Sequence, residues 1–212
     1  MPTDLAASPY QRVLGRDLAG LHPRLRAYFS AIPLGSVGRG DGIFDVVGTP
    51  RRWLWPALWL LGRAGIVFPV WQHGVPFSVT NRPVTDAGGS PAVSAVRRFR
   101  FSGGHRDMTD LIAAPAGGLI DRLGSGGILE AAFEAGVAEG GLVLTSTKVA
   151  VRVGGLALVV PSRIAPVVRL SERFDDAADR QRIGVTIDAP LLGRLYEYRG
   201  SFTYSVDREG DS

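Results

Sequence analysis

Hydrophobic residues recur at steps of three and four along residues 8–30, the spacing that places them on one face of a helix. Ser8 can cap this segment at its N-terminus, and Pro9 fits the first helical turn. Pro23 interrupts the run, because the residue before a proline disfavours the helical conformation. The pattern therefore predicts two helices within residues 8–30 that meet at His22.

A further helix is predicted over residues 51–62, where nearly every position is apolar. Trp53, Trp55 and Trp59 belong to this segment. A helix that is apolar on all sides is either buried in the fold or forms a lid that presents its side chains to another molecule. Burial is the favoured interpretation, and a lid is the alternative.

Residues 53–71 are apolar over nearly the length that crosses the core of a bilayer. Arg63 would lie in the middle of such a span, and Pro69 would break the helix. Gly62 and Gly65 indicate a turn. We therefore expect a short helix followed by a strand, and no membrane span.

From about residue 66 the hydrophobic pattern changes to a period of two, which is typical of half-buried strands. About twelve candidate strands lie between residues 37 and 206, among them 66–72 and 75–84. Their connections are short, which favours antiparallel pairing, and so many strands usually curl. We expect a mainly β (α+β) fold, a strongly curved antiparallel sheet or barrel-like sheet that encloses a pocket, with N-terminal helices and one Trp-rich helix.

The length of 212 residues indicates a single domain over 1–212, with a β body at 66–206 and a tail at 207–212. Hydrophobic residues make up 45% of the chain, which is enough for one core. The N-terminus lacks the basic and apolar regions of a secretory signal. The expected location is therefore the cytoplasm.

The residue types exclude several kinds of site. The chain has no cysteine, so it has no disulfide, thiolate nucleophile or cysteine-bound zinc. Its 3 histidines lack metal-binding spacing, and no GxSxG nucleophile motif occurs. The glycine-rich stretches 35–42 and 124–127 are expected to be turns, because neither joins a strand to a helix as a dinucleotide motif does. No metal and no other cofactor is expected.

The net charge of +4 comes from arginine, since Lys148 is the one lysine of the chain. The arginines are scattered along the sequence, with pairs at 51–52 and 97–98. Nucleic-acid binding needs a clustered basic patch, because contacts to phosphates supply most of its affinity. Nucleic acid is therefore not an expected partner.

Alternation places three charged residues on apolar strand faces, because residues two apart share a face. The three are Arg97 between Ala95 and Phe99, Asp110 between Met108 and Ile112, and Glu172 between Leu170 and Phe174. A buried charge without a partner is costly, and the simplest partner for Arg97 is Glu172. A structural ion pair is the simpler interpretation.

The functional interpretation puts these charges in a cavity inside the curved sheet. Arg97 would orient a carboxylate, enolate or carbonyl group, and Glu172 or Asp110 would accept a proton. These three residues are the candidate catalytic groups.

Aromatic side chains are the candidate contacts for an apolar ligand. Phe99 shares a strand face with Arg97, and Tyr196 and Tyr198 share a face of the last strand. Trp55 and Trp59 of the predicted helix would line the mouth of the cavity. Tyrosines on a strand face are more often packing residues, so this interpretation stays open.

A series of short motifs resembles the bacterial domain-of-unknown-function family numbered 4166, over roughly residues 8–204. The motifs lie at residues 8–15, 21–26, 38–40, 97–99, 121–124, 164–166 and 193–200, with Glu172 between the last two. The family pattern Trp-x-Arg-x-Phe falls on Ala95, Arg97 and Phe99, where alanine replaces the tryptophan and could enlarge a pocket. The family's Glu-Arg-Phe-Gly resembles residues 121–124, with the shorter acid Asp121. The resemblance implies a domain that occurs alone or fused behind a dehydrogenase domain, with no general activity attached.

Together these features predict a cofactor-independent enzyme, of cyclase or isomerase type, that acts on a hydrophobic specialised metabolite bound inside the barrel-like sheet. One alternative is a non-catalytic binding or carrier module for an apolar small molecule. The other is a domain that docks onto another chain through its tryptophan helix, and a homodimer is one possible form of that arrangement.

Overall fold

Alternating apolar residues form eleven strands in the computed structural model, which describes residues 7–153 and 156–210. All the strand pairs are antiparallel. The strands are β1 (Ser36–Gly48), β2 (Trp71–Thr85), β3 (Pro91–Phe101), β4 (Gly104–Ala113), β5 (Leu119–Leu123), β6 (Leu129–Ala138), β7 (Gly141–Val153), β8 (Leu156–Val159), β9 (Val167–Asp175), β10 (Arg180–Ala189) and β11 (Gly193–Arg208).

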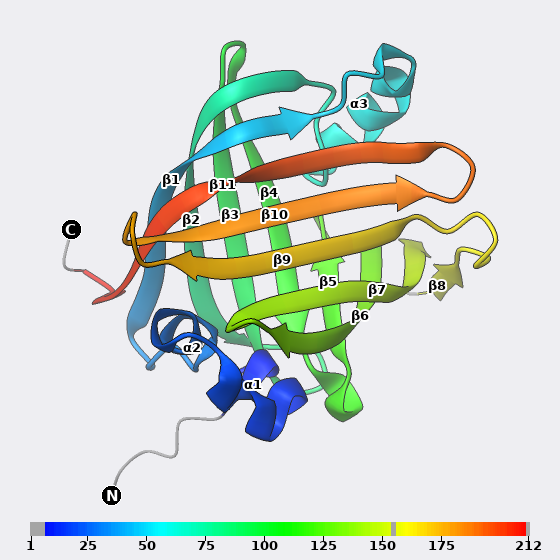
Figure 1. Ribbon diagram of the computed structural model, residues 1–212. Helices are drawn as coiled ribbons and strands as arrows, with labels where there is room; N and C mark the ends of the chain where they lie inside the picture. The colour runs from blue at the N-terminus through cyan, green and yellow to red at the C-terminus, as the bar shows by residue number, and fades with distance from the viewer. Residues whose placement is uncertain (1–6, 154–155, 211–212) are drawn as a thin grey trace, which may run out of the picture.

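Ten of these strands close into a barrel (Figure 1). Hydrogen-bonded neighbours follow the order β6-β5-β4-β3-β2-β1-β11-β10-β9-β7, and β6 also pairs with β7 to complete the circle. An open sheet would leave the backbone groups of its two edge strands unpaired, and closure pairs these edges with one another. The expected mainly β fold with a curved antiparallel sheet is confirmed.

Strand β7 changes partner along its length. Residues 142–145 pair with β9, whereas residues 150–153 pair with the extra strand β8. The wall between β7 and β9 is therefore continuous near the start of β7 and parts toward the end of the barrel at which β8 lies.

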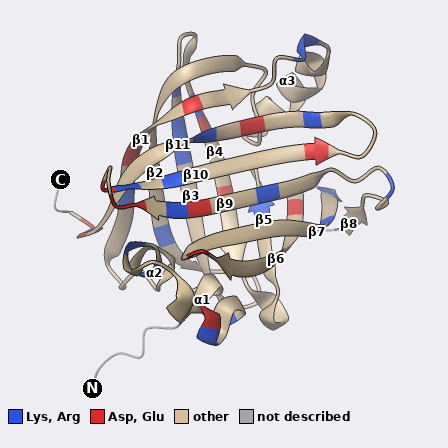
Figure 2. Cartoon of the chain, viewed as in Figure 1, with Lys and Arg blue, Asp and Glu red and all other residues tan. Residues whose placement is uncertain are grey.

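The outer face of the barrel is charged. Figure 2 shows bands of both signs on β9, β10 and β11. Arg182 pairs with Asp175 at 2.6 Å, and Arg194 pairs with Asp188 at 2.7 Å. Such exposed pairs contribute little to stability, but they keep this face of the barrel wet and its apolar face turned inward.

Two glycines allow β1 and β11 to approach closely. A Cβ atom on Gly42 would lie 2.2 Å from the carbonyl oxygen of Ser201, and one on Gly200 would lie 2.2 Å from that of Ile43. The expected turn at residues 35–42 is therefore wrong for its larger part, since most of this stretch lies in β1. Gly38, Gly40 and Gly42 lie in β1 and pack against β11, whereas Gly35 lies in the turn before the strand.

The N-terminal helices cover one end of the barrel (Figure 1). They are α1 (Pro9–Leu14), a 3-10 helix (Gly15–Gly20) and α2 (Pro23–Phe29). The Ser8 hydroxyl accepts a hydrogen bond from the Gln11 amide, and the Gln11 side chain accepts one from the Ser8 amide, which forms a capping box. Leu25 and Phe29 are buried with Leu119 and Leu142 of the barrel. The break predicted near Pro23 is confirmed.

The tryptophan-rich segment forms a short 3-10 helix (Arg52–Leu54) and α3 (Trp55–Arg63). Leu58 is buried, but Trp53 and Trp59 are 60% and 53% exposed. The favoured burial of this helix is therefore wrong, because one face contacts the barrel and the other is uncovered. A further short 3-10 helix (Pro115–Gly117) joins β4 to β5.

The strand expected over residues 66–72 is replaced by an irregular segment. Ile66, Val67 and Phe68 are all buried although they follow one another, and strand β2 begins only at Trp71. Three consecutive buried residues do not alternate, so the apolar run reflects a segment tucked into the barrel end. In the part of the chain that the structure describes, no helix is long and apolar enough to cross a membrane.

The approach of β1 to β11 predicts a strong effect of Gly42→Ala. The added Cβ would collide with backbone, so we expect the free energy of unfolding to fall by about 1–3 kcal/mol, measured by urea denaturation. Gly136→Ala in β6 is the control, since a Cβ there meets no atom within 4 Å. The control should be neutral or stabilising by up to about 1 kcal/mol. Equal losses of unfolding free energy in both variants would contradict the close approach of β1 to β11 as the cause.

Candidate functional site

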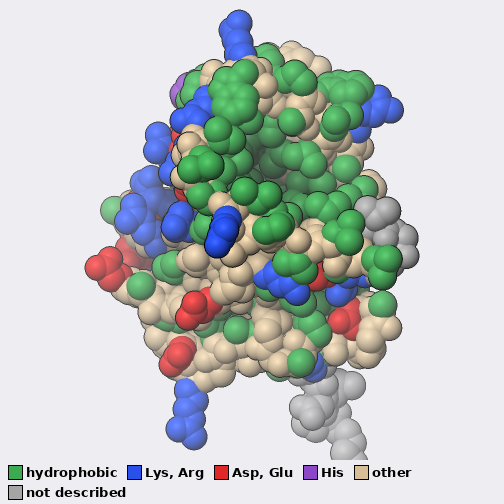
Figure 3. All heavy atoms as spheres, turned by 90° about the vertical axis from the view of Figure 1, so that its right-hand side faces the viewer, with side chains coloured by type: hydrophobic (Ala, Val, Ile, Leu, Met, Phe, Trp, Pro, Cys, Tyr) green, Lys and Arg blue, Asp and Glu red, His purple; other side chains and the backbone are tan. Residues whose placement is uncertain are grey.

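A cavity of about 240 Å³ lies inside the barrel, between α3 and the N-terminal helices. Most of the side chains that line it are apolar and come from α3, from residues 66–67 and from the strands. They include Leu58, Ile66, Leu129, Val168, Ile187 and Leu195. Figure 3 looks at the molecule from the right-hand side of Figure 1 and shows a hollow ringed by hydrophobic side chains. The hollow is the mouth of the barrel.

A group of polar side chains also lines this cavity. Its members include Tyr10, Tyr28, Arg97, Asp121, Glu172 and Tyr198. Tyr10 and Tyr28 come from α1 and α2, and the charges of Arg97 and Glu172 both act on them. The polar groups therefore face the end of the cavity that the N-terminal helices close, and the mouth is apolar.

Arg97 points into the barrel, as strand alternation predicted, and only 13% of its side chain is exposed. Its Nη1 donates a hydrogen bond of 2.6 Å to Oδ1 of Asp110, whose side chain is 1% exposed. The expected pairing of Arg97 with Glu172 is therefore wrong. Asp110 lies within reach of Arg97 because β4 is the neighbour of β3. In the register of these two strands, Asp110 lies opposite Ala95, two residues from Arg97 on the same face. Glu172 lies on β9, outside this strand pair.

Asp121 is a partly buried acid that the sequence patterns did not mark as a site residue. It lies on β5, and Ile112 of β4 is its register partner, two residues from Asp110. Burial and the neighbouring Asp110 carboxylate raise the pKa of Asp121 well above its usual range, and Arg97 opposes this only in part. Asp121 Oδ1 and Asp110 Oδ2 are buried without a hydrogen-bond partner among the described residues. In its protonated form, which these surroundings favour, Asp121 can donate a hydrogen bond.

The signal that could have found Asp121 was present in the chain. Leu119, Asp121 and Leu123 alternate in β5, and Leu119 is buried while Asp121 and Leu123 line the cavity. The same test that marked Arg97 therefore applies to Asp121. Its strand has only 5 residues, which made the alternation hard to recognise.

Glu172 lies on β9 and is also buried, as expected. Burial raises its pKa to about 7, although a hydrogen bond from Gln181 and the charge of Arg97 both act to lower it. Gln181 Nε2 donates this bond to Oε2 of Glu172 at 2.5 Å. At neutral pH Glu172 therefore exists in both protonation states and can accept or release a proton.

The tyrosines of the cavity stay protonated. Burial raises the pKa of Tyr198 to about 12 and raises the pKa values of Tyr10 and Tyr28 as well. The Tyr196 hydroxyl accepts a hydrogen bond from the backbone amide of Phe68 at 3.4 Å, so it holds the segment tucked into the barrel end. Tyr198 is the better candidate for contact with a ligand, and Tyr196 combines lining the cavity with a structural role.

Three of the predicted ligand contacts do not line the cavity. Phe99 is fully buried among aromatic rings, including Phe44 at a centroid distance of 5.3 Å. Trp55 donates a hydrogen bond from its indole to the carbonyl of Thr49 at 3.4 Å, and Trp59 points outward. On α3 the lining residues are instead Leu58 and Leu61, because they occupy the face that meets the barrel.

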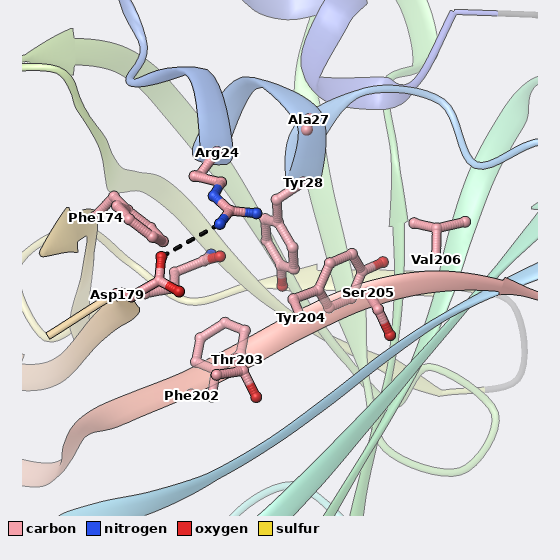
Figure 4. Close-up of a pocket in the computed structure, with 11 residues that line it drawn as sticks. Arg24, Ala27, Tyr28, Phe174, Asp179, Phe202, Thr203, Tyr204, Ser205 and Val206 are labelled. Atoms are coloured by element: carbon pink, nitrogen blue, oxygen red, sulfur yellow. Dashed lines mark hydrogen bonds and ion pairs between the residues drawn. The ribbon is translucent and has the colours of Figure 1, made fainter. Parts of the chain in front are cut away.

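A second cavity, of about 200 Å³, lies below α2 (Figure 4). Arg24 and Asp179, which both line it, form an ion pair of 3.3 Å, and Tyr28 lines both this cavity and the barrel cavity. Arg24 and Asp179 are largely exposed, so their ion pair is weak. We assign the candidate site to the barrel cavity, which is lined by Arg97, Asp121 and Glu172. Asp110, a predicted catalytic residue, does not line this cavity and is the ion-pair partner of Arg97.

These features define a closed antiparallel β-barrel with an internal cavity that is apolar at its mouth and carries buried charges at its far end. The chain matches the family described as "Domain of unknown function (DUF4166)" over residues 21–202, and it belongs to that family. A search of curated proteins found no match for the chain.

Among the described residues, no group of three or more His, Asp or Glu side chains is arranged to hold a metal ion. That the site needs no metal and no other cofactor stays a prediction.

The ion pair in the barrel predicts that Arg97→Ala lowers the free energy of unfolding by about 3–5 kcal/mol, because it leaves the buried Asp110 without its partner. The double variant Arg97→Gln with Asp110→Asn removes both charges and should recover most of this loss. Urea denaturation of the three proteins checks the prediction. A loss below about 1 kcal/mol for Arg97→Ala would contradict it.

The raised pKa of Glu172 predicts how stability depends on pH. Its carboxyl has an ordinary pKa of 4.5 and a pKa of about 7 in the folded chain, so the folded state keeps a proton that the unfolded state loses. The stability from this group is fully present below pH 4.5 and is lost as the pH rises through 7, by up to about 1.4 kcal/mol per pH unit. Glu172→Gln should remove this part of the decline.

Unfolding free energies at a series of pH values between 4.5 and 8 measure the effect. Asp121 adds a decline of the same sign, but it is present in both proteins and cancels in the comparison. Parallel curves for the wild type and Glu172→Gln would show that Glu172 titrates normally.

Proposed function

We propose that the chain is a cofactor-independent enzyme, of isomerase or cyclase type, that acts on a hydrophobic specialised metabolite held in the barrel cavity. The observation that carries the proposal is the presence, in one apolar cavity, of Glu172 with a pKa near 7 beside the donors Arg97 and Asp121. Buried polar groups fixed by a fold stabilise developing charge better than water does. A biosynthetic role and a location in the cytoplasm are parts of this proposal.

The chemistry that fits these groups is proton transfer between two carbon atoms of one substrate. Glu172 as the carboxylate would accept a proton from the carbon beside a carbonyl group. Arg97 and neutral Asp121 would donate hydrogen bonds to the carbonyl oxygen, which gains negative charge as the enolate forms. Glu172 would then return the proton to a different carbon. The product is therefore an isomer of the substrate, and Glu172 ends in the protonation state in which it began.

A cyclase would use the same cavity in a second way. Apolar walls that hold a flexible chain in a folded conformation bring its reacting atoms together before the reaction. The volume of about 240 Å³ is slightly below the usual range for ligand sites. It favours a compact substrate, or a longer one that extends through the mouth.

A non-catalytic carrier is the second candidate, because the apolar lining alone would bind an apolar molecule. A carrier gains nothing from the carboxyl oxygens of Asp110 and Asp121, which are buried without a hydrogen-bond partner among the described residues. Such groups lower stability, so their presence favours a catalytic role.

The test begins with native mass spectrometry of the freshly purified protein and extraction of any bound compound. The extracted compound is then incubated in D₂O with the wild type or with Glu172→Gln. We expect the wild type to form an isomer or to introduce deuterium at carbon. The variant should bind the compound but react about 10²–10⁴ times more slowly, because it lacks the group that accepts the proton.

Glu134→Gln is the matched control, since it makes the same chemical change on an exposed side chain of β6. It should react at the rate of the wild type. A compound that binds tightly but leaves the wild type unchanged and without deuterium would contradict the enzymatic proposal and favour the carrier.

A further inference from the structure

Most of the exposed large hydrophobic side chains of the described residues gather around the mouth of the barrel. They lie in three segments, residues 51–63, 156–164 and 189–194, which we call the mouth surface. Its exposed apolar members are Trp53, Trp59, Leu60, Leu61, Leu156, Leu158, Val159, Ile164, Leu191 and Leu192. Figure 3 faces this surface and shows hydrophobic side chains on several sides of the hollow. A patch of this kind marks an interaction site.

The three segments meet around one opening. Leu58 and Leu61 of the first segment line the cavity, as do Pro166, just after the second, and Leu195, just after the third. The guanidinium of Arg51 donates a hydrogen bond to the carbonyl of Leu192, which ties the start of the tryptophan segment to the β10–β11 turn. The mouth surface is therefore one continuous surface around the cavity opening.

The charged residues of the mouth surface all have one sign. Its three segments contain five basic residues and no acidic residue: Arg51, Arg52, Arg63, Arg163 and Arg194. Among the described residues, the first four form no ion pair with a carboxylate, whereas Arg194 pairs with Asp188 and Glu197. The mouth surface therefore combines exposed apolar side chains with arginines whose positive charge is not neutralised by a carboxylate.

Two of these arginines lie against tryptophan rings. The guanidinium carbon of Arg63 is 5.0 Å from the centroid of the Trp59 ring, and that of Arg52 is 5.6 Å from the Trp55 ring. Tryptophan prefers the boundary between headgroups and acyl chains, and arginine next to it can reach lipid phosphates. Basic residues near an anionic bilayer each add to the binding free energy.

We propose that the mouth surface docks on an anionic phospholipid membrane, with α3 at the level of the headgroups and the cavity open toward the acyl chains. A second copy of the chain fits less well, because a two-fold contact would bring the arginines of one copy against those of the other. Docking is independent of the proposed chemistry. If the cavity does take an apolar substrate, the bilayer is where such a molecule would be found.

The experiment measures flotation of the purified chain with lipid vesicles. One vesicle is phosphatidylcholine alone, and the other contains phosphatidylcholine and phosphatidylglycerol. We expect binding to the anionic vesicles that weakens as salt is added, and at least about tenfold weaker binding to phosphatidylcholine. Tryptophan emission should shift to shorter wavelength on binding, because Trp53 and Trp59 leave water.

Charge variants test whether the mouth surface makes the contact. The triple variant Arg52→Gln, Arg63→Gln and Arg163→Gln should weaken binding to anionic vesicles by about tenfold or more. All three side chains lie at the surface and form no ion pair with a carboxylate among the described residues, so the fold should not change. The separate variant Trp59→Ser should also weaken binding and reduce the emission shift.

The matched control removes the same number of charges from the helices at the opposite end. Arg12→Gln, Arg16→Gln and Arg26→Gln affect exposed residues of the N-terminal helices, so this variant should bind as the wild type does. Equal weakening in both triple variants would overturn the proposal, because net charge alone would then explain binding. The proposal is also overturned if the wild type does not bind anionic vesicles. A dimer that Trp59→Ser dissociates would then identify a second copy of the chain as the partner of the mouth surface.

Discussion

A single positive charge inside an apolar barrel constrains the rest of the site. Arg97 stands on an inward face of β3 and cannot remain there without a negative partner. Asp110 supplies that charge, and burial together with the Asp110 carboxylate raises the pKa of a second acid, Asp121. Burial raises the pKa of Glu172, on another strand, to about 7, although the same arginine acts to lower it. The charge of Arg97 acts to lower the pKa values of Asp121 and Glu172, and burial outweighs it at both.

The barrel changes in character from one end to the other. Helices α1 and α2 close the end at which the charged groups gather, and they add the hydroxyls of Tyr10 and Tyr28. At the other end the walls are apolar, and α3 lies beside the opening with tryptophans exposed. An apolar molecule that enters by this mouth reaches the polar groups last, which suits a substrate with one polar end.

Alternation within single strands was sufficient to place Arg97, Asp110 and Glu172 inside the sheet, because a period of two requires no information from elsewhere in the chain. The partner of Arg97 depends instead on strand order, and β4 is the neighbour of β3 whereas β9 is not. Asp121 follows the same alternation, but its strand has 5 residues, and so few positions give a weak pattern. An all-apolar helix such as α3 does not reveal by its own pattern whether anything covers it. The glycines of β1 resemble turn residues until β11 is seen to lie against them.

The central claim is that burial raises the pKa of the Glu172 carboxyl to about 7. The most direct test is an NMR titration of the Glu172 carboxyl carbon in protein labelled with ¹³C at glutamate, with Glu172→Gln used to assign the signal. The account predicts a midpoint near pH 7. A midpoint near the ordinary value of 4.5 would contradict it, because burial would then leave the pKa of this carboxyl unchanged.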